Sequence, residues 1–152
     1  MQEKIIFVFP GQGAQYVGMG ADIWRDFVSA RYVFQQVSDI AKRDIKKLCF
    51  EGPQSELNKP ENTSLATFAH SVAIANVIEA EYAMPLHALA YAMAGHSMGQ
   101  YSALYCVGSM KMADAVQMLS ARATYMQDVA GAGGMVAIVG LSKDEVVSCM
   151  VA

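Results

Sequence analysis

The segment around Ser97 constrains the fold of this chain most, because it combines a short apolar run, a Gly-x-Ser-x-Gly motif and a helix. Residues 91–95 predict a strand, Gly95-His96-Ser97-Met98-Gly99 predicts a sharp turn, and residues 98–107 predict a helix that Gly108 ends. A strand, a strained turn and a helix in this order are typical of a nucleophile elbow, in which the serine stands clear of the backbone. We therefore expect Ser97 at the tip of a strand.

The rest of the chain alternates between strand and helix patterns. Residues 4–9 are rich in Ile, Val and Phe, which predicts a strand of a parallel sheet buried on both faces, and Pro10 ends it. Helical spacing predicts two or three short helices over residues 22–48, a turn or short helix over 55–58, a long helix over 64–82 capped by Thr63, and a helix over 114–129. This order favours an α/β fold with a parallel sheet flanked by helices.

Glycines at 131, 133 and 134 mark a boundary between two parts of the chain. Beyond them, residues 135–139 predict a strand, and Ser142 with Glu145 forms a capping box that opens a helix at Val146. One strand and part of a helix cannot bury a core. We therefore assign residues 1–130 to an α/β core and residues 131–152 to the beginning of a small, incomplete subdomain.

Composition and charge argue against nucleic acid and against a membrane. The net charge is −3, and the basic residues Lys42, Arg43, Lys46 and Lys47 are interrupted by Asp44, which favours the solvated face of a helix. Residues 86–110 carry no Lys, Arg, Asp or Glu and could span a bilayer by length, but glycines at 95 and 99 would break a helix at the centre. We expect no membrane segment.

Three cysteines, Cys49, Cys106 and Cys149, are widely spaced and form no Cys-x-x-Cys pair. An odd number without such a motif predicts buried thiols in a reducing compartment, so we expect a cytoplasmic protein without a metal site. The short apolar run at residues 5–9 predicts a strand and not a signal peptide.

A glycine-rich loop, Gly11-Gln12-Gly13, follows the first strand. Its spacing to Gly18 does not match a dinucleotide fingerprint, so we expect these glycines to let the backbone approach another loop closely. Arg122 falls on the apolar stripe of its predicted helix, together with Ala115, Leu119 and Met126. Two readings of Arg122 stay open at this point: a side chain that snorkels or meets a structural carboxylate, or a fork that binds an anionic group. We expect His70 to be a core or interfacial histidine.

Three segments together, Phe9-Pro10-Gly11-Gln12-Gly13-Ala14-Gln15, Gly95-His96-Ser97-Met98-Gly99 and Arg122, resemble malonyl-CoA:acyl carrier protein transacylases. The same pattern is found in the acyltransferase domains of fatty acid and polyketide synthases. The resemblance covers the whole chain but only about the N-terminal half of a typical member. It implies an α/β core with the start of a ferredoxin-like α+β subdomain. It also implies malonyl-CoA and acyl carrier protein as partners, with no cofactor beyond these substrates.

The resemblance implies a ping-pong transfer for fatty acid biosynthesis, with a malonyl-serine intermediate on Ser97. It assigns the oxyanion hole to the backbone N–H groups of Gln12 and Met98, and the binding of the malonyl carboxylate to Arg122.

The chain also departs from the family pattern. The family's base is a histidine about a hundred residues after the serine, beyond the 152 residues here. Gln100 stands where the family has Glu, and Ser64-Leu65 replaces a Gln-Pro pair. Two alternatives remain: a non-catalytic fragment or binding module that keeps the CoA and carrier-protein surface, and a serine hydrolase or thioesterase. The sequence does not predict the oligomeric state.

Overall fold

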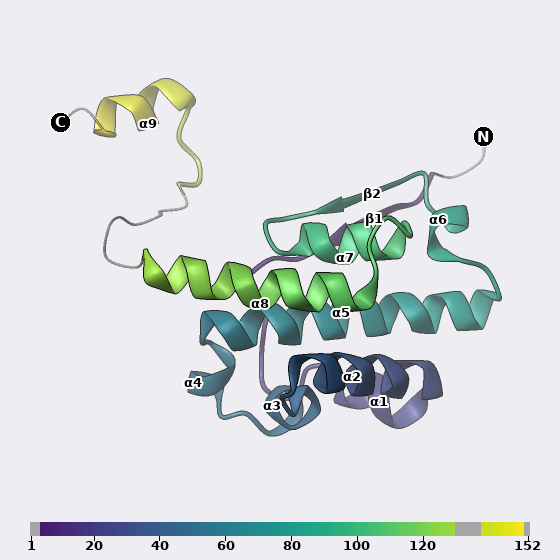
Figure 1. Cartoon of the computed structure of the whole chain (residues 1–152). Helices are drawn as coiled ribbons and strands as arrows, with labels where there is room; N and C mark the ends of the chain where they lie inside the picture. The colour runs from purple at the N-terminus through teal and green to yellow at the C-terminus, as the bar shows by residue number, and fades with distance from the viewer. Residues whose placement is uncertain (1–3, 130–137, 151–152) are drawn as a thin grey trace.

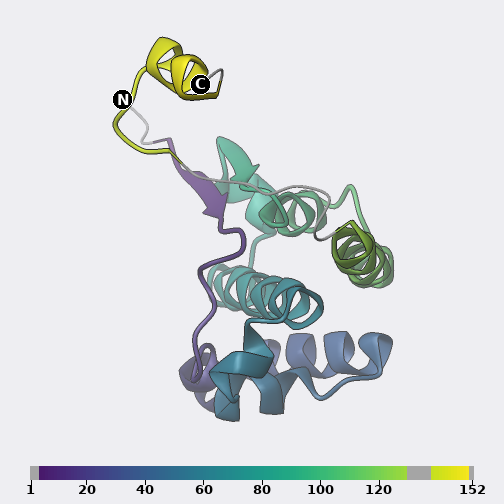
Figure 2. The ribbon, with the colours of Figure 1, turned by 90° about the vertical axis from the view of Figure 1, so that its left-hand side faces the viewer.

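Strands β1 (Ile6–Phe9) and β2 (Ala92–Gly95) pair in parallel, with Ile6 opposite Ala92 and Phe9 opposite Gly95. The computed structural model describes residues 4–129 and 138–150. Figures 1 and 2 show the sheet in one layer with helix α7 (Gly99–Cys106), and helices α5 (Pro60–Tyr82) and α8 (Met112–Asp128) beneath it. The layer beyond α5 consists of α1 (Ala21–Asp26), α2 (Val28–Ala41), α3 (Ile45–Glu51) and α4 (Gln54–Leu57). The predicted α/β class and parallel pairing are confirmed.

Strand β1 is buried on one face only, so the prediction of burial on both faces is wrong. Phe9 is buried, with Phe7 packed against the same small cluster, whereas Ile6 and Val8 are 56% and 71% exposed. Successive side chains of a strand point to opposite faces, and helices α5, α6 (Leu86–Leu89) and α7 cover only the face of Phe7 and Phe9. A continuous apolar run does not indicate which face of a strand is buried, because it carries no information on the elements that cover each face.

Helix α5 lies at the centre of the molecule (Figure 2). Its residues 63–69 are all buried, which is the pattern of a helix surrounded by other elements. Helices α2 (Val28–Ala41), α7 and α8 pack around it. The core between these helices consists mainly of Val33, Phe34, Val37, Leu65, Phe68, Val72, Val116 and Leu119.

Helix α5 begins at Pro60, four residues before the predicted start, and Thr63 does not cap it. Proline is favoured in the first turn because its fixed φ suits the helix and its missing N–H has no partner there. The hydroxyl of Thr63 instead donates to the carbonyl of Leu57 at 2.6 Å, inside the core. The helix ends at Tyr82, as predicted, with Ala83 in the left-handed region at φ 50°.

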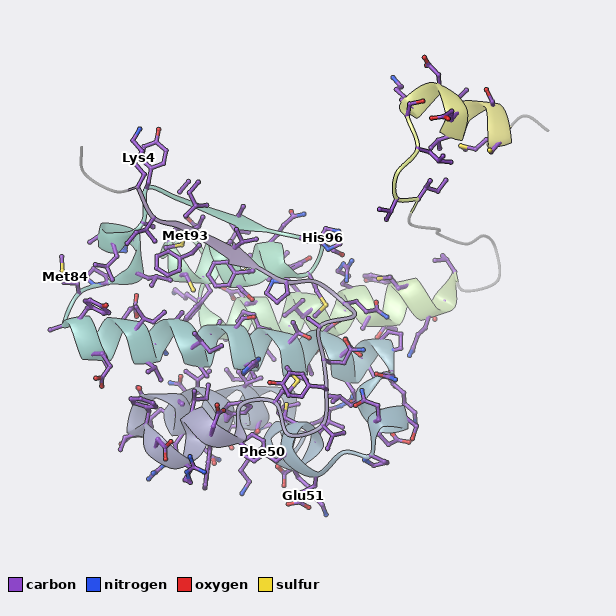
Figure 3. The ribbon with its side chains drawn as sticks, turned by 180° about the vertical axis from the view of Figure 1, so that it is seen from behind. Lys4, Phe50, Glu51, Met84, Met93 and His96 are labelled. Carbon is purple, nitrogen blue, oxygen red and sulfur yellow. The ribbon has the colours of Figure 1, made fainter. Side chains whose placement is uncertain are left out.

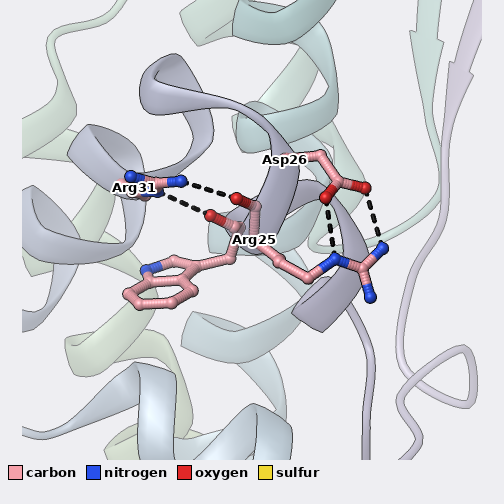
Figure 4. A network of polar contacts seen from close by, with 4 residues as sticks. Arg25, Asp26 and Arg31 are labelled. Atoms are coloured by element: carbon pink, nitrogen blue, oxygen red, sulfur yellow. Dashed lines mark hydrogen bonds and ion pairs between the residues drawn. The ribbon is translucent and has the colours of Figure 1, made fainter.

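The predicted short helices are α1 (Ala21–Asp26), α2, α3 (Ile45–Glu51) and α4 (Gln54–Leu57). Figure 4 shows how α1 is held to α2: the guanidinium of Arg31 donates to the carbonyls of Trp24 and Arg25 at 2.8 and 2.5 Å. Arg25 pairs with the carboxylate of Asp26 at 2.7 and 2.8 Å. Arg31 thus satisfies carbonyls at the end of α1 that have no partner within the helix.

The basic residues near position 45 are largely solvated, but they do not form one helix face. Lys42 ends α2 in the left-handed region, and Asp44 caps α3 by accepting from the backbone N–H of Lys47 at 2.8 Å. Lys42, Arg43 and Lys47 are exposed around this turn.

Residues 86–110, the stretch with no charged side chain, fold into α6, β2 and α7. In the described part of the chain, no helix has the length and apolar character required to cross a bilayer.

Helix α9 (Lys143–Met150) stands apart from the other elements in Figure 1. Ser142 donates through its backbone N–H and its hydroxyl to the carboxylate of Glu145 at 2.8 and 2.7 Å, so the capping box is confirmed. The helix starts at Lys143, earlier than the predicted Val146, because Ser142 itself occupies the capping position. Of the strand predicted over residues 135–139, residues 135–137 lie outside the described residues, and 138–139 are not in a strand. The subdomain boundary stays a prediction.

The cysteines divide into two kinds. Cys49 and Cys106 are buried, as predicted, and burial raises the pKa of each thiol to about 12. Cys149 on α9 is exposed, so its predicted burial is wrong.

Candidate active site

Ser97 lies in a tight turn between β2 and α7, with a φ of 52° in the left-handed region. The turn has no room for side chains on either glycine of the motif. A Cβ on Gly95 would lie 2.2 Å from the carbonyl carbon of Gly99, and a Cβ on Gly99 would lie 2.3 Å from the carbonyl oxygen of Phe9. The strained elbow expected from the motif is therefore present, and Ser97 is half-buried rather than fully exposed.

The glycine-rich loop after β1 presses against this elbow. A Cβ on Gly11 would lie 2.7 Å from Nδ1 of His96 and 3.4 Å from Cβ of Ser97. The backbone N–H of His96 donates to the carbonyl of Phe9 at 3.0 Å. Figure 3 shows His96 at one end of the sheet and Lys4 at the other. The expectation that glycine permits a close approach of two loops is confirmed at Gly11.

Two backbone N–H groups, one in the loop after β1 and one directly after Ser97, have no partner among the described residues. Neither Gln12 nor Met98 donates a backbone hydrogen bond there. Met98 is anchored by its side chain, which is 2% exposed, and it precedes α7, whose first amides point towards the elbow. Gln12 follows Gly11 and is exposed. Both groups are free to bind an oxyanion, and this role stays a prediction.

Arg122 reaches Ser97 from α8. Its Nη2 donates to Oγ of Ser97 at 2.9 Å, and the side chain is half-buried. Within the described residues it forms no ion pair, so no structural carboxylate engages it. The structure therefore brings the serine hydroxyl of the elbow and a cation into direct contact.

The predicted apolar stripe of α8 is only partly correct. Ala115 and Leu119 are buried as expected, but the stripe continues through Ala123, and Met126 is 38% exposed. Arg122 consequently lies at the edge of the buried face. On the neighbouring face, the amide Nε2 of Gln127 donates to the carboxylate of Glu61 on α5.

A shallow groove of about 530 Å³ opens beside Arg122. Its walls are mostly apolar and come from α7 and α8, with Tyr101, Met118, Tyr125 and Met126 among them. The sequence reasoning missed Tyr101 and Tyr125, although Tyr125 follows Arg122 by three residues on the same helix and so shares its side. Apolar walls around one cation suit an acyl group with an anionic end.

A larger cavity of about 770 Å³ lies on the other side of α5, between α2 and the turn into α3. Trp24, Arg31 and Lys46 line it. None of the residues that contact Ser97 belongs to this cavity, so its size does not make it the candidate active site.

No histidine bonds Ser97 in the described part of the chain. His96 is exposed beside Gly11, and His87 lies on α6. His70 is half-buried under β1, where burial lowers its pKa and the charge of Asp22 partly opposes the shift. These positions agree with the expectation that His70 is a core or interfacial histidine.

The two departures from the family pattern lie in different environments. Gln100 is exposed in the first turn of α7, whereas Ser64 and Leu65 are buried on α5. In residues 4–129 and 138–150, no three His, Cys, Asp or Glu side chains gather in a way that could hold a metal ion.

Comparisons with known proteins, by sequence and by structure, all identify acyl transferases. A sequence model described as an acyl transferase domain matches residues 6–152. The chain is 42% identical over 125 residues to a malonyl CoA-acyl carrier protein transacylase of Bacillus subtilis, an alignment that covers 82% of this chain and 30% of that protein.

Two solved structures extend the similarity to the fold. An acyl-carrier-protein-S-malonyltransferase from Bartonella henselae superimposes with a TM-score of 0.87 at 32% identity, covering 98% of this chain and 48% of that one. A malonyl-transacylase in complex with its type II PKS acyl-carrier protein superimposes with a TM-score of 0.75 at 38% identity, covering 84% and 40%. The chain spans less than half of the length of each of these three proteins.

Proposed function

This chain belongs to the acyl transferase domain family, and from that membership we propose that it carries the nucleophile of a malonyl transferase. In this function, a malonyl group moves from malonyl-CoA to the phosphopantetheine thiol of acyl carrier protein and supplies fatty acid biosynthesis. The observation that carries the proposal is the hydrogen bond of 2.9 Å between Nη2 of Arg122 and Oγ of Ser97. It supports a site in which a carboxylate-binding cation lies next to the attacking oxygen.

In the first half-reaction, Oγ of Ser97 attacks the thioester carbonyl of malonyl-CoA. A bond forms between Oγ and the carbonyl carbon, the carbon–sulfur bond breaks, and CoA leaves with the proton of the hydroxyl. The negative charge that develops on the carbonyl oxygen would be stabilised by the backbone N–H groups of Gln12 and Met98. One such donor contributes about 3 kcal/mol to lowering a barrier of this kind.

In the second half-reaction, the carrier-protein thiol attacks the malonyl-serine ester and restores the hydroxyl. The resemblance assigns the proton transfers to a histidine beyond these 152 residues. We therefore propose that efficient turnover requires a base that His70, His87 and His96 do not provide. We also propose a cytoplasmic location, which the buried free thiols of Cys49 and Cys106 support.

Arg122 would bind the malonyl carboxylate through two parallel N–H···O bonds, which acetyl-CoA cannot form. The apolar groove beside it would accommodate the rest of the acyl group. We assign residues 131–152 to the start of a small subdomain on the sequence pattern alone.

The test is the mass of the chain after incubation with malonyl-CoA. It should be run with and without a second polypeptide that supplies the remaining part of a relative such as the Bacillus subtilis transacylase. We expect a malonyl adduct on Ser97 in the complemented form and little or none with the chain alone. Ser97→Ala should abolish the adduct, whereas Ser109→Ala, at an exposed position outside the elbow, should not.

Other outcomes favour the alternatives. No adduct in the complemented form would favour a binding module. Malonyl release to water at the same rate with and without carrier protein would favour a hydrolase. Ordinary enzyme rates with the 152-residue chain alone would contradict the need for an external base.

A further inference from the structure

In the free protein, Arg122 already holds the oxygen that has to attack. Nη2 of Arg122 donates to Oγ of Ser97 at 2.9 Å. Among the described residues, neither side chain forms another hydrogen bond. Among the described residues, this one contact is therefore what engages the hydroxyl of Ser97.

This contact restrains the hydroxyl in two ways. A serine oxygen has two lone pairs, and one of them accepts a hydrogen bond from a cation, which lowers the electron density available for attack. The guanidinium nitrogen also lies 2.9 Å from Oγ, and a carbonyl carbon must come within about 3–3.5 Å of the same oxygen. An acyl group that leaves Arg122 in place meets an oxygen that is already engaged.

Arg122 can move without disturbing the core. The buried side of α8 is formed by Ala115, Leu119 and Ala123, while Arg122 lies at its edge and lines the open groove. Only one of the five N–H donors of the guanidinium is used by Ser97, and the described residues provide no carboxylate for the others. The cation is thus available to an anion that enters the groove.

A carboxylate competes well for this cation. It accepts two parallel hydrogen bonds from one guanidinium edge, and each charge-assisted bond is about twice as strong as a bond between neutral groups. The neutral hydroxyl of Ser97 accepts a single bond. A carboxylate in the groove would therefore shift Arg122 away from Oγ.

We propose that Arg122 restrains Oγ of Ser97 in the free protein and releases it when a carboxylate on the acyl donor binds the guanidinium. The inference rests on the proposed function and extends it. Arg122 would select the acyl group by freeing the nucleophile as well as by binding the substrate, so an uncharged donor would be disfavoured in kcat and not only in KM.

The test uses an uncharged sulfonyl fluoride that labels Ser97 in the complemented form of the chain. The bond from Oγ to sulfur forms, the sulfur–fluorine bond breaks, and fluoride leaves with the hydroxyl proton passing to solvent. Arg122→Ala should be labelled at least about tenfold faster than the wild type, because one hydrogen bond from a charged group is lost. Lys111→Ala removes a positive charge at the other end of α8 and should be labelled at the wild-type rate.

Equal or slower labelling of Arg122→Ala would overturn the proposal, because it would mean that the cation leaves the nucleophile unaffected or assists it in the resting state. The main result of a second measurement comes from the wild type alone. Formate, the smallest carboxylate, should accelerate labelling of the wild type and leave Arg122→Ala unaffected. Formate that slows labelling of the wild type, or leaves it unchanged, would also overturn the proposal.

These outcomes are separate from those of the malonyl adduct. If the malonyl adduct forms but neither Arg122→Ala nor formate accelerates labelling of Ser97, the transferase function stands and the proposed restraint by Arg122 is wrong. If labelling responds as expected but no malonyl adduct forms, the restraint stands and the substrate assignment is wrong.

Discussion

The helical layers and the sheet differ in how completely this chain buries them. In the packing of α2, α5 and α8, Phe34, Phe68 and Leu119 are at most 1% exposed. On the outer face of β1, Val8 is 71% exposed, and Tyr125 beside the groove is 69% exposed. Ser97 and Arg122 are half-buried, between these two extremes. The comparison indicates that the helices supply most of the buried core, while the candidate site lies where burial is incomplete.

The largest expected difference between the two regions is in stability. Phe68→Ala should lower the free energy of unfolding by about 3–5 kcal/mol, because it removes a buried ring that packs edge-to-face on Tyr105, with 6.1 Å between the ring centroids. Val8→Ala should change it by no more than about 0.5 kcal/mol. Urea unfolding of both variants measures the contrast. Similar losses would break the comparison, because they would show that the face of Val8 is covered in solution.

The elbow at Gly99 packs against the backbone that follows β1, and Gly99→Ala tests how much this close packing contributes to stability. A Cβ there would lie 2.3 Å from the carbonyl oxygen of Phe9 and 2.6 Å from that of Pro10. We expect a loss of about 1–3 kcal/mol in unfolding free energy together with slower labelling of Ser97. Gln100→Ala, at the exposed next position, should affect neither. A stable Gly99→Ala variant with unchanged labelling would show that the two loops can separate freely.

A matched pair of threonines on α5 sharpens the account of the helical core. Both are buried, but the hydroxyl of Thr63 donates to Leu57, whereas Oγ1 of Thr67 has no partner in the described residues. Thr63→Val should lower the unfolding free energy by about 1 kcal/mol, and Thr67→Val should raise it by a similar amount. Thermal unfolding of both variants provides the measurement, and a shift in the same direction for both would contradict the assigned hydrogen bonding.

The smallest expected effect concerns His70, which lies between the helices and β1. Burial lowers its pKa, so the unfolded chain binds the proton more strongly than the folded chain does. Stability should therefore be retained above the ordinary histidine pKa of about 6.5 and should fall as the pH drops below it. His70→Gln should flatten this part of the profile between about pH 8 and pH 5. An identical slope in the variant would exclude His70 as its cause.

The sequence predicted the elements that depend on local chemistry. The glycines of the elbow, the close approach at Gly11 and the capping box at Ser142 all follow from backbone geometry that few residues tolerate. Helical spacing in the sequence also predicted that Arg122 lies near the apolar face of its helix.

The features that the sequence did not predict depend on tertiary contacts, which a local sequence pattern does not specify. The apolar run of β1 gives no sign that only one face is covered. Thr63 was predicted to cap the helix, but the helix begins at Pro60, and the Thr63 hydroxyl donates to the carbonyl of Leu57. The resemblance placed Arg122 and Ser97 in one site, and the structure confirms that they meet, but helical spacing alone predicts no partner 25 positions away.

The most direct measurement of the central claim compares acyl groups on Ser97 in the wild type and in Arg122→Ala. After incubation of the complemented form with malonyl-CoA or acetyl-CoA, the mass of the peptide that contains Ser97 reports each adduct. The account predicts that the wild type takes malonyl over acetyl, and that Arg122→Ala loses malonyl while it accepts acetyl at least as well as before. An equal loss of both acyl groups in Arg122→Ala would contradict it.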